Sequence, residues 1–296
     1  MIATELDCGG RVLVLDRARI AGIVNVTPDS FSDGGAFASP ADAVEHGLRL
    51  VGEGADLLDV GGESTRPGAA AVDAAEEIAR VVPVIEALAR ATDVPIAVDT
   101  SKPEVMQAAV AAGAGLVNDV HALRRDGALE AVAGLGVPVV LVHMLGEPRT
   151  MQDDPQYDDV VGEVHRFLTD RLFACQMAGI ERRRIVVDPG FGFGKTLAHN
   201  LALLRALARF AELAPVMAGL SRKASIGALT GQPDPAARAA GSAAAALIAV
   251  QRGAAIVRVH DVAATRDALA VWQAVAAGDT APRPRAAPRP AGWDED

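Results

Sequence analysis

Short apolar runs alternate along the chain with stretches in which apolar residues recur every three or four positions. The runs are rich in Val and Ile, and their apolar residues are consecutive, which is typical of strands buried on both faces of a parallel sheet. The longer spacing is typical of amphipathic helices. The predicted strands are Ile20–Val26, Leu57–Val60, Ile96–Val98, Leu116–Val117, Val139–His143, Ile185–Val187, Val216–Leu220 and Ile256–Val259. The predicted helices are Ala41–Gly54, Ala74–Ala91, Pro103–Ala112, Asp126–Leu135, Val160–Ala178, Ala198–Leu213, Ala236–Arg252 and Ala264–Ala277.

Proline and glycine mark several of the predicted helix ends. Pro40 and Pro103 stand at helix starts, where a missing backbone N–H removes no helical hydrogen bond. Gly113, Gly179 and Gly253 follow helices, where a left-handed residue often ends the last turn. These signals support the predicted order of elements.

The count of strand-then-helix units is eight, which predicts a (β/α)8 barrel, an α/β fold. An open, doubly wound sheet uses the same alternation of strands and helices. We favour the barrel because the count is eight and because no dinucleotide-binding glycine fingerprint follows the first strand.

The two ends of the chain differ from the repeating middle. Residues before Ile20 are expected to form a short hairpin, with Arg11–Leu15 as one apolar strand. Residues 279–296 are rich in Pro, Arg and Ala without any apolar period, so we expect a disordered tail. The sequence therefore predicts one barrel domain over residues 1–278, followed by that tail.

Composition narrows the class of protein. The chain has 296 residues, half of them hydrophobic, and its 28 basic and 38 acidic residues give a net charge of −10. That charge argues against nucleic acid as a partner. Cys8 and Cys175 match no metal-binding spacing, and no apolar run approaches the length of a membrane span. Charged residues near the N-terminus, Glu5, Asp7 and Arg11, argue against the apolar region of a signal peptide. We expect a cytoplasmic protein that acts on small molecules, away from membranes.

Polar residues follow every predicted strand. In (β/α)8 barrels the C-terminal strand ends meet at one rim and carry the active site. Helix capping explains any one of these residues but explains the whole set poorly. The rim set is Asp99, Asn118, Asp188, Lys223, Arg258 and His260.

The chemistry of the rim points to a flat heterocycle that carries phosphate. Asp and Asn side chains pair well with the amide and amine edge of a guanine-like ring, whereas Arg, Lys and His suit phosphate. Asn25 is a hard oxygen donor that could help to place Mg²⁺. Phe31, Phe193 and Met144 offer apolar contact to a ring.

Two competing motifs are rejected. Gly194-Lys195-Thr196 resembles the end of a phosphate-binding P-loop, but that motif requires glycine at position 189, which is Pro189. His143 and His260 could suggest a zinc pair, but no third ligand has a telling spacing.

The remaining histidines and lysines receive no chemical role. We expect the other histidines on the surface or on helices, and Lys102 and Lys195 along the rim. These histidines are His46, His121, His165 and His199.

Long motifs after the strands resemble those of the dihydropteroate synthases of bacterial folate synthesis, in order, from about residue 20 to residue 275. His143-Met144 and Thr150-Met-Gln152 also fit that pattern. The main motifs are Asn25-Val-Thr-Pro-Asp-Ser-Phe-Ser-Asp-Gly-Gly35, Asp59-Val-Gly-Gly-Glu-Ser-Thr-Arg-Pro-Gly68, Asp188-Pro-Gly-Phe-Gly-Phe193, Ser221-Arg-Lys223 and Arg258-Val-His-Asp261.

The resemblance implies the condensation of 6-hydroxymethyl-7,8-dihydropterin diphosphate with 4-aminobenzoate, which gives 7,8-dihydropteroate and pyrophosphate. It implies catalytic roles for Asp99, Lys223, Arg258 and His260. The implied pterin contacts are Asp99, Asn118, Met144, Asp188, Lys223 and Arg258. The implied contacts of diphosphate and aminobenzoate are Asn25, Phe31, Thr65, Arg66, Pro67, Phe193, Ser221 and His260, with Mg²⁺ at Asn25.

One departure from the family pattern concerns the residue after Lys223. Many relatives have serine there, and this chain has Ala224 followed by Ser225. We expect backbone N–H groups at the next helix start to hold the aminobenzoate carboxylate instead.

Two alternatives to the synthase remain open: a methyltetrahydrofolate-binding barrel of a corrinoid methyl-transfer system, and a non-catalytic pterin-binding paralogue. The resemblance also implies a homodimer through late helices. The stretch Ala236–Val250 of the predicted helix has almost no charge around its circumference, which suits burial on both faces.

Overall fold

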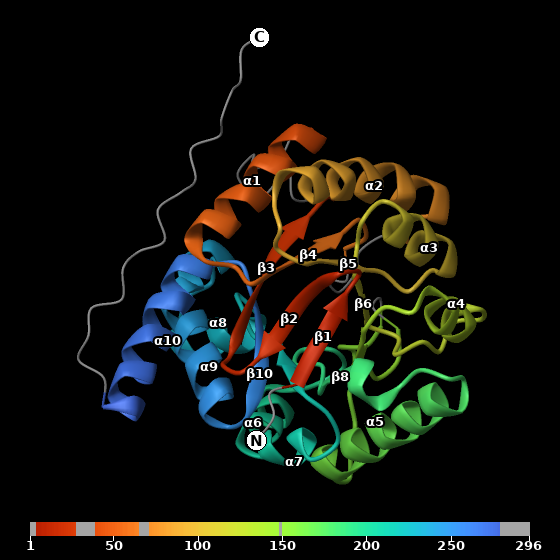
Figure 1. Ribbon diagram of the computed structural model, residues 1–296. Coiled ribbons are helices and arrows are strands. Elements are labelled where there is room, and N and C mark those ends of the chain that lie inside the picture. The colour runs from red at the N-terminus through yellow and green to blue at the C-terminus, as the bar shows by residue number, and fades with distance from the viewer. Residues whose placement is uncertain (1–3, 28–38, 65–70, 148–149, 279–296) are drawn as a thin grey trace.

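Eight parallel strands close into a barrel in the computed structural model, which describes residues 4–27, 39–64, 71–147 and 150–278 (Figure 1). The strand order around the barrel is β10-β3-β4-β5-β6-β7-β8-β9, so each neighbour but one follows in sequence. The predicted (β/α)8 barrel is confirmed. The strands are β3 (Arg19–Asn25), β4 (Leu57–Gly61), β5 (Ile96–Asp99), β6 (Leu116–Asp119), β7 (Val139–Val142), β8 (Ile185–Asp188), β9 (Val216–Ala218) and β10 (Ala254–Val259).

Helices surround the barrel, and most match their predicted ranges within a few residues. They are α1 (Pro40–Glu53), α2 (Ala74–Ala91), α3 (Pro103–Ala111), α4 (Ala128–Leu135), α5 (Val160–Met177), α6 (Leu197–Arg205), α7 (Ala208–Ala211), α8 (Ala224–Thr230), α9 (Ala239–Gln251) and α10 (Val262–Ala277), with the short 3-10 helices η2 (Arg182–Arg184) and η3 (Pro235–Arg238).

Two predicted helices differ from the structure. The stretch expected over Ala198–Leu213 is divided into α6 and α7, and the turn between them lets both Leu207 and Phe210 be buried. The helix expected from Ala236 begins as η3, where the Asp234 carboxylate accepts the N–H of Ala236 and holds a tight first turn.

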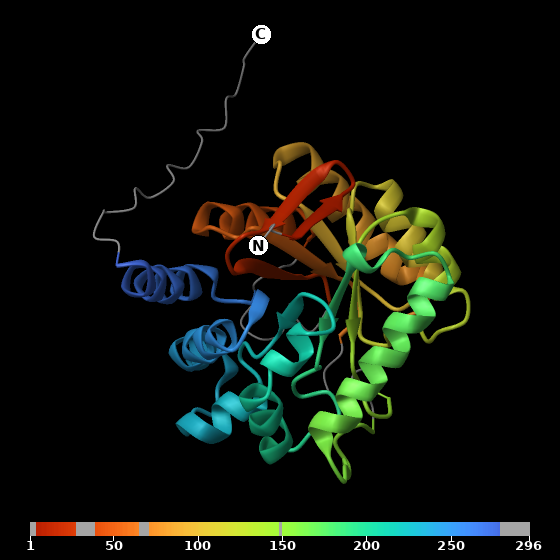
Figure 2. The same cartoon turned by 60° about the horizontal axis from the view of Figure 1, so that its bottom comes forward.

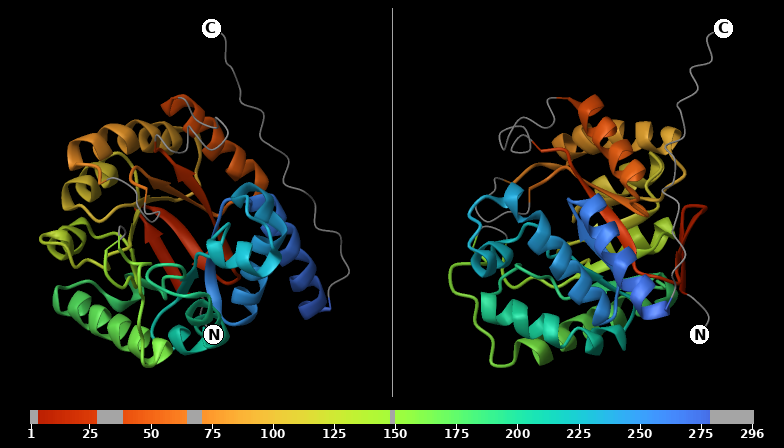
Figure 3. Two further views of the ribbon diagram at one scale, coloured as in Figure 1. Left: turned by 180° about the vertical axis from the view of Figure 1, so that it is seen from behind. Right: turned by 90° about the vertical axis from the view of Figure 1, so that its left-hand side faces the viewer.

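The N-terminal hairpin lies across one end of the barrel (Figure 1). Strands β1 (Thr4–Cys8) and β2 (Arg11–Leu15) pair antiparallel, and their buried residues join the apolar cluster of the barrel interior. Gly115 fits under Cys8 only because it has no side chain: a Cβ there would lie 2.0 Å from the Cys8 carbonyl oxygen. Helix α8, which follows a C-terminal strand end, lies at the opposite end of the barrel (Figure 3).

Strand alternation positions the site. Successive residues of a strand point to opposite faces, so every second residue points into the barrel. Interior residues of the central layer pack together, among them Leu57, Ala97, Leu116, Val186 and Ile256. Two positions further along the same strands, the inward residues at the mouth are Asp59, Asp99, Asn118, Asp188 and Arg258.

Helices α9 and α10 pack side by side on one flank of the barrel (Figure 2). Within one chain only one side of α9 is covered: Ala245 and Ala249 are buried, whereas Ile248 is 41% exposed. Burial on both faces, which its composition suggests, therefore needs a partner outside this chain. No helix among the described residues is long and apolar enough to cross a membrane.

Candidate active site

Arg258 lies at the centre of the barrel mouth between two carboxylates. Its Nε donates to Asp59 Oδ2, and its Nη2 donates to Asp99 Oδ2 at 2.7 Å. The three side chains come from β10, β4 and β5, so this contact crosses the mouth. Burial alone lowers the pKa of an arginine, but these two negative charges outweigh it and raise the pKa of Arg258. The guanidinium is therefore a permanent, fixed positive charge.

Asp99 is held in a setting that opposes ionisation. Burial raises the pKa of its carboxyl to about 7, against the lowering effect of Arg258 and with a further rise from nearby Asp59. A shift of this kind at a barrel mouth is characteristic of functional carboxyls. Asp99 can therefore change its charge near neutral pH.

Asn118 and Asp59 share a hydrogen bond at the same level of the barrel. Asn118 Nδ2 donates to Asp59 Oδ2 at 3.0 Å, and both side chains are almost fully buried. Asn118 Oδ1 and Asp59 Oδ1 make no hydrogen bond with the described residues. Buried oxygens without partners are costly, so both atoms point to a ligand that donates hydrogen bonds.

Asp188 and Lys223 form the next part of the mouth. Asp188 Oδ1 accepts the N–H of Gly190 at 2.7 Å, while Lys223 Nζ donates to the Phe191 carbonyl and lies 4.5 Å from the centre of the Phe193 ring. Burial raises the pKa of Asp188, and burial lowers the pKa of Lys223 to about 8, although each charge favours the other. Asp188 can therefore accept a hydrogen bond from a ligand, and Lys223 can donate one to it.

An apolar wall stands beside these groups. Met144 is 2% exposed and packs with Val120 and Met151, and Phe193 packs against that cluster. This wall offers a ring the apolar contact expected of Met144 and Phe193.

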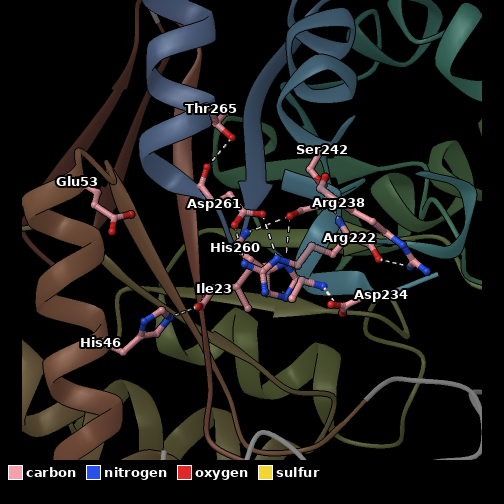
Figure 4. Close-up of polar contacts among 12 residues, drawn as sticks. Ile23, His46, Glu53, Arg222, Asp234, Arg238, Ser242, His260, Asp261 and Thr265 are labelled. Atoms are coloured by element: carbon pink, nitrogen blue, oxygen red, sulfur yellow. Dashed lines mark hydrogen bonds and ion pairs between the residues drawn. The ribbon is translucent and has the colours of Figure 1, made fainter. Parts of the chain in front are cut away.

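His260 directly follows β10 (Figure 4), and Ser221, in the turn after β9, lies beside it. Ser221 Oγ is 3.0 Å from His260 Nδ1, and the backbone N–H of His260 donates to the same oxygen at 3.1 Å. The hydroxyl therefore fixes the position of the imidazole, whose other nitrogen is Nε2.

Between Ser221 and Lys223, Arg222 has a left-handed backbone with φ of +57°. Its N–H donates to Ser242 Oγ at 2.9 Å, and its carbonyl accepts from Arg238 Nη1 at 2.9 Å. These contacts hold a conformation that is rare for residues other than glycine. The turn sends Ser221 and Lys223 to different parts of the mouth.

Lys102 and Lys195 do not line the rim, contrary to expectation, because both are buried against acceptors. Lys102 Nζ contacts Glu63 Oε2 at 2.8 Å and Glu77 Oε2 at 2.5 Å. Lys195 Nζ lies 2.9 Å from His143 Nδ1 and 3.0 Å from the Phe193 carbonyl. Burial lowers the pKa of both Lys195 and His143, and their contact joins the loop before α6 to the residue after β7.

His121 was expected on the surface or on a helix, but it is 6% exposed and lies in the loop after β6. The Asp119 carboxylate accepts its backbone N–H at 2.8 Å, and Ala122 and Leu123 after it both have positive φ. This hydrogen bond folds the loop inward, which sequence patterning alone does not indicate.

Asn25 ends β3 at the rim, and its side chain makes no hydrogen bond with the described residues. A free amide oxygen at this position suits Mg²⁺, which usually takes one or two protein ligands beside phosphate oxygens and water. The described residues contain no group of three or more Asp, Glu, His or Cys side chains that could by itself hold a metal ion. Phe31, Thr65, Arg66 and Pro67 lie outside the described residues.

The sequence matches that of a known family. The profile of the pterin binding enzymes matches residues 21–260. The dihydropteroate synthase of Escherichia coli strain K12 is 50% identical over 271 residues, covering 91% of this chain and 96% of that one. The chain belongs to the dihydropteroate synthase family.

Solved structures of the dihydropteroate synthase family agree. The enzyme of Xanthomonas albilineans with 4-aminobenzoic acid has 64% identity and a TM-score of 0.88, over 95% of this chain and all of that one. The same enzyme with 7,8-dihydropteroate has 58% identity and a TM-score of 0.83, over 94% of this chain and all of that one. A sulfonamide complex from Yersinia pestis has 47% identity and a TM-score of 0.89, over 92% and 99%.

Three residues of the mouth were not among the sequence-based candidates: Asp59, Val120 and Gly219. Asp59 was quoted in a motif without a role, because it precedes the strand end by two residues. A Cβ on Gly219 would lie 3.8–3.9 Å from Arg258 Cβ, Asp188 Oδ2 and Lys223 Nζ. Counting inward positions back from each strand end is the signal that could have found Asp59.

Proposed function

We propose that the chain condenses 6-hydroxymethyl-7,8-dihydropterin diphosphate with 4-aminobenzoate to give 7,8-dihydropteroate and pyrophosphate. The observation that carries this proposal is the set of buried acceptors at the mouth, with Lys223 and Arg258 beside them, in a chain of this family. A pterin ring has the amide and amine donors that such acceptors require.

The pterin is proposed to lie between the polar floor and the apolar wall of the mouth. Asp99, Asn118 and Asp188 accept hydrogen bonds from the ring edge, Met144 packs on its face, and Lys223 donates to a ring acceptor. Buried acceptors matched to ring donors give strong discrimination, because a ligand without those donors leaves them unpaired.

Bond breaking separates charge between the two ends of this substrate. The carbon–oxygen bond to the diphosphate breaks, its electron pair leaves with pyrophosphate, and the pterin methylene becomes cationic. Arg258 and His260 are proposed to stabilise the negative charge that grows on pyrophosphate, while ionised Asp99 favours the positive ring. The neutral aromatic amine then attacks the methylene carbon and loses its proton, for which no strong base is needed.

Asn25 would hold Mg²⁺ together with oxygens of the diphosphate. When bound, the metal supplies positive charge to the leaving group. The position of Asn25 at the rim, without a hydrogen bond from its side chain to the described residues, supports this assignment.

The aminobenzoate slot is proposed to lie near Phe193 and Ser221, with the first turn of α8 facing the carboxylate. Because Ala224 cannot donate from its side chain, backbone N–H groups there carry that contact. We retain Phe31, Thr65, Arg66 and Pro67 as proposed contacts of diphosphate and aminobenzoate.

We also propose a homodimer in the cytoplasm. The uncovered sides of neighbouring helices carry exposed apolar residues, namely Ile248 on α9 and Val271 and Val275 on α10. Burial of such a patch against a second copy removes apolar surface from water. Sedimentation should give twice the chain mass, and Val271→Glu with Val275→Glu should give monomers; a monomeric wild-type protein would contradict the dimer.

Pyrophosphate release tests the proposed reaction. Purified protein is mixed with the pterin diphosphate, 4-aminobenzoate and Mg²⁺, and both pyrophosphate and dihydropteroate are measured. Equal amounts of the two products are expected. Release no faster than without protein would refute the proposal, and pterin binding without release would favour a non-catalytic paralogue.

A further inference from the structure

Asp59 is an almost fully buried carboxylate at the barrel mouth, and the proposed mechanism gives it no direct part. Its side chain is 1% exposed, on β4, at the level where the apolar interior gives way to the polar mouth. A single oxygen, Oδ2, accepts from both Asn118 Nδ2 and Arg258 Nε. One atom therefore connects two groups that face the ligand.

The first contact fixes the orientation of the Asn118 amide. An ionised carboxylate only accepts hydrogen bonds, so the amide must turn its NH2 group toward Asp59. Asn118 Oδ1 is then directed away from Asp59, and it has no hydrogen-bond partner in the described part of the chain. The pocket meets its ligand at this point with an acceptor, and the ligand must supply a donor.

The second contact fixes the plane of the Arg258 guanidinium. Nε is held by Asp59 on β4 and Nη2 by Asp99 on β5, which leaves little freedom to rotate. The hydrogen bonds of this guanidinium with the described residues are made by Nε and Nη2, which leaves Nη1 as the nitrogen for a ligand contact. A planar guanidinium fixed in advance loses little entropy when it binds a ligand.

We propose that Asp59 is a positioning residue that sets the hydrogen-bond polarity of the pterin pocket before substrate arrives. It turns Asn118 so that an acceptor faces the ring, and it orients Arg258 against Asp99. The inference rests on the proposed function for the identity of the ligand, and it adds a specificity rule: the ring atom that meets Asn118 must carry hydrogen.

Asp59→Asn is the informative variant because it keeps the shape of the side chain. The single amide oxygen can still accept from Asn118 and Arg258, but both contacts lose the negative charge of the carboxylate, and an NH2 group takes the place of the acceptor Oδ1. We expect the pterin alcohol without diphosphate to bind about 10- to 100-fold more weakly by calorimetry. The KM for 4-aminobenzoate should change less than twofold, a split that a general loss of folded protein would not produce.

The same strand supplies the matched control. Asp56 directly precedes β4 at the other end of the barrel, where it accepts from Arg17 and Arg19, each at 3.0 Å. Asp56→Asn therefore removes a carboxylate with two arginine partners from the same strand, far from the mouth. It is expected to leave pterin binding unchanged.

A double-mutant cycle tests whether Asp59 acts through Asn118. In the Asn118→Ala background the amide is absent, so Asp59→Asn should cost several-fold less in pterin binding than it does in the wild type. Fully additive losses would overturn the role in orienting Asn118. Pterin binding by Asp59→Asn within twofold of the wild type would overturn the whole inference.

Wild-type protein gives an independent measurement if Asp59→Asn does not fold. The side-chain amide hydrogens of Asn118, assigned by their absence in Asn118→Ala, should exchange slowly with solvent before any ligand is added. Fast exchange would overturn the inference. If the wild-type protein binds the pterin but releases no pyrophosphate, the proposed reaction is refuted and the positioning role is not, because that role is measured by binding. If the wild-type protein releases pyrophosphate and Asp59→Asn binds the pterin as tightly as the wild type, the positioning role is refuted and the proposed reaction is not.

Discussion

Two hydrogen bonds join the guanidinium of Arg222 to the carboxylate of Asp261, with Nε–Oδ2 at 3.0 Å and Nη2–Oδ1 at 2.5 Å (Figure 4). The pair connects the turn after β9 to the residue after His260. It therefore sets the spacing between two loops that carry proposed substrate contacts, and it helps to hold Arg222 in its left-handed conformation. Bidentate pairs of this kind are geometrically demanding.

Two replacements of Arg222 distinguish the contribution of the ion pair to stability from that of the left-handed backbone. Arg222→Ala and Arg222→Gly both remove the ion pair, but only glycine adopts positive φ without strain. We expect Arg222→Gly to be more stable than Arg222→Ala by about 1 kcal/mol in urea unfolding. Both variants should lose activity, because Ser221 and Lys223 are less well placed. Equal stability of the two variants would show that the left-handed backbone carries no penalty here.

Much of the barrel could be predicted from sequence because the relevant signals are local. Consecutive Val and Ile residues, Pro at helix starts and Gly at helix ends each depend on a few neighbouring positions. The strand-end residues Asp99, Asn118 and Asp188 were also predictable, because the fold brings all strand ends to one rim. Their closeness to one another follows from topology and needs no knowledge of side-chain contacts.

The environments of Lys102 and Lys195 could not be predicted in this way. Each lies near the end of a strand, but its partners come from distant parts of the chain: Glu63 and Glu77 for Lys102, and His143 for Lys195. Burial of a charge depends on whether such partners converge in three dimensions. Asp59 escaped notice for a different reason, because it lies two residues before the end of β4 and only strand-end residues were taken as candidates.

The buried contact between Lys102 and Glu77 is expected to contribute to the free energy of unfolding. Lys102→Met leaves the fully buried Glu77 carboxylate without its counter-charge, so the free energy of unfolding should fall by about 3–5 kcal/mol at pH 7. Urea unfolding followed by circular dichroism measures this loss. Lys102→Met combined with Glu77→Leu should recover most of it.

The stability of Lys102→Met should also depend on pH. Burial raises the pKa of Glu77 in the folded state, and loss of Lys102 raises it further. Glu77 of the folded variant then holds a proton that the unfolded chain releases near pH 4.5. The loss in free energy of unfolding relative to the wild type should therefore grow as pH rises above that value and shrink in acid. Arg183→Ala, which breaks an exposed pair with Glu181, serves as control and should leave stability unchanged. A deficit that does not vary with pH would argue against ionised Glu77 as its cause.

Asp99 and Lys223 predict a narrow pH optimum for kcat/KM. Asp99 gains its negative charge as pH rises through about 7, whereas Lys223 loses its positive charge as pH rises through about 8. The profile should therefore be bell-shaped, with its maximum between these values. Asp99→Asn should remove the acidic limb and Lys223→Arg the basic limb. A profile that is flat from pH 6 to 9 would contradict both assignments.

Removal of a charge at the mouth should lower kcat while the barrel remains folded. Lys223→Ala and Arg258→Ala are each expected to lower kcat by on the order of 10²–10³, as for loss of one transition-state charge contact. Pyrophosphate release measures the loss, and circular dichroism shows whether the barrel remains folded. A fall of less than threefold in both variants would remove these residues from the proposed mechanism.

Gly219 offers a steric test of where the pterin lies. It directly follows β9, and a Cβ there would be in ordinary contact with Arg258, Asp188 and Lys223, without the positive φ that would restrict substitution. Gly219→Ala should therefore be tolerated. Gly219→Val places two further methyl groups among these three polar side chains, and we expect at least a tenfold loss of pterin binding by calorimetry with little change in the KM for 4-aminobenzoate. Pterin binding by Gly219→Val as tight as that of the wild type would move the ring away from this part of the mouth.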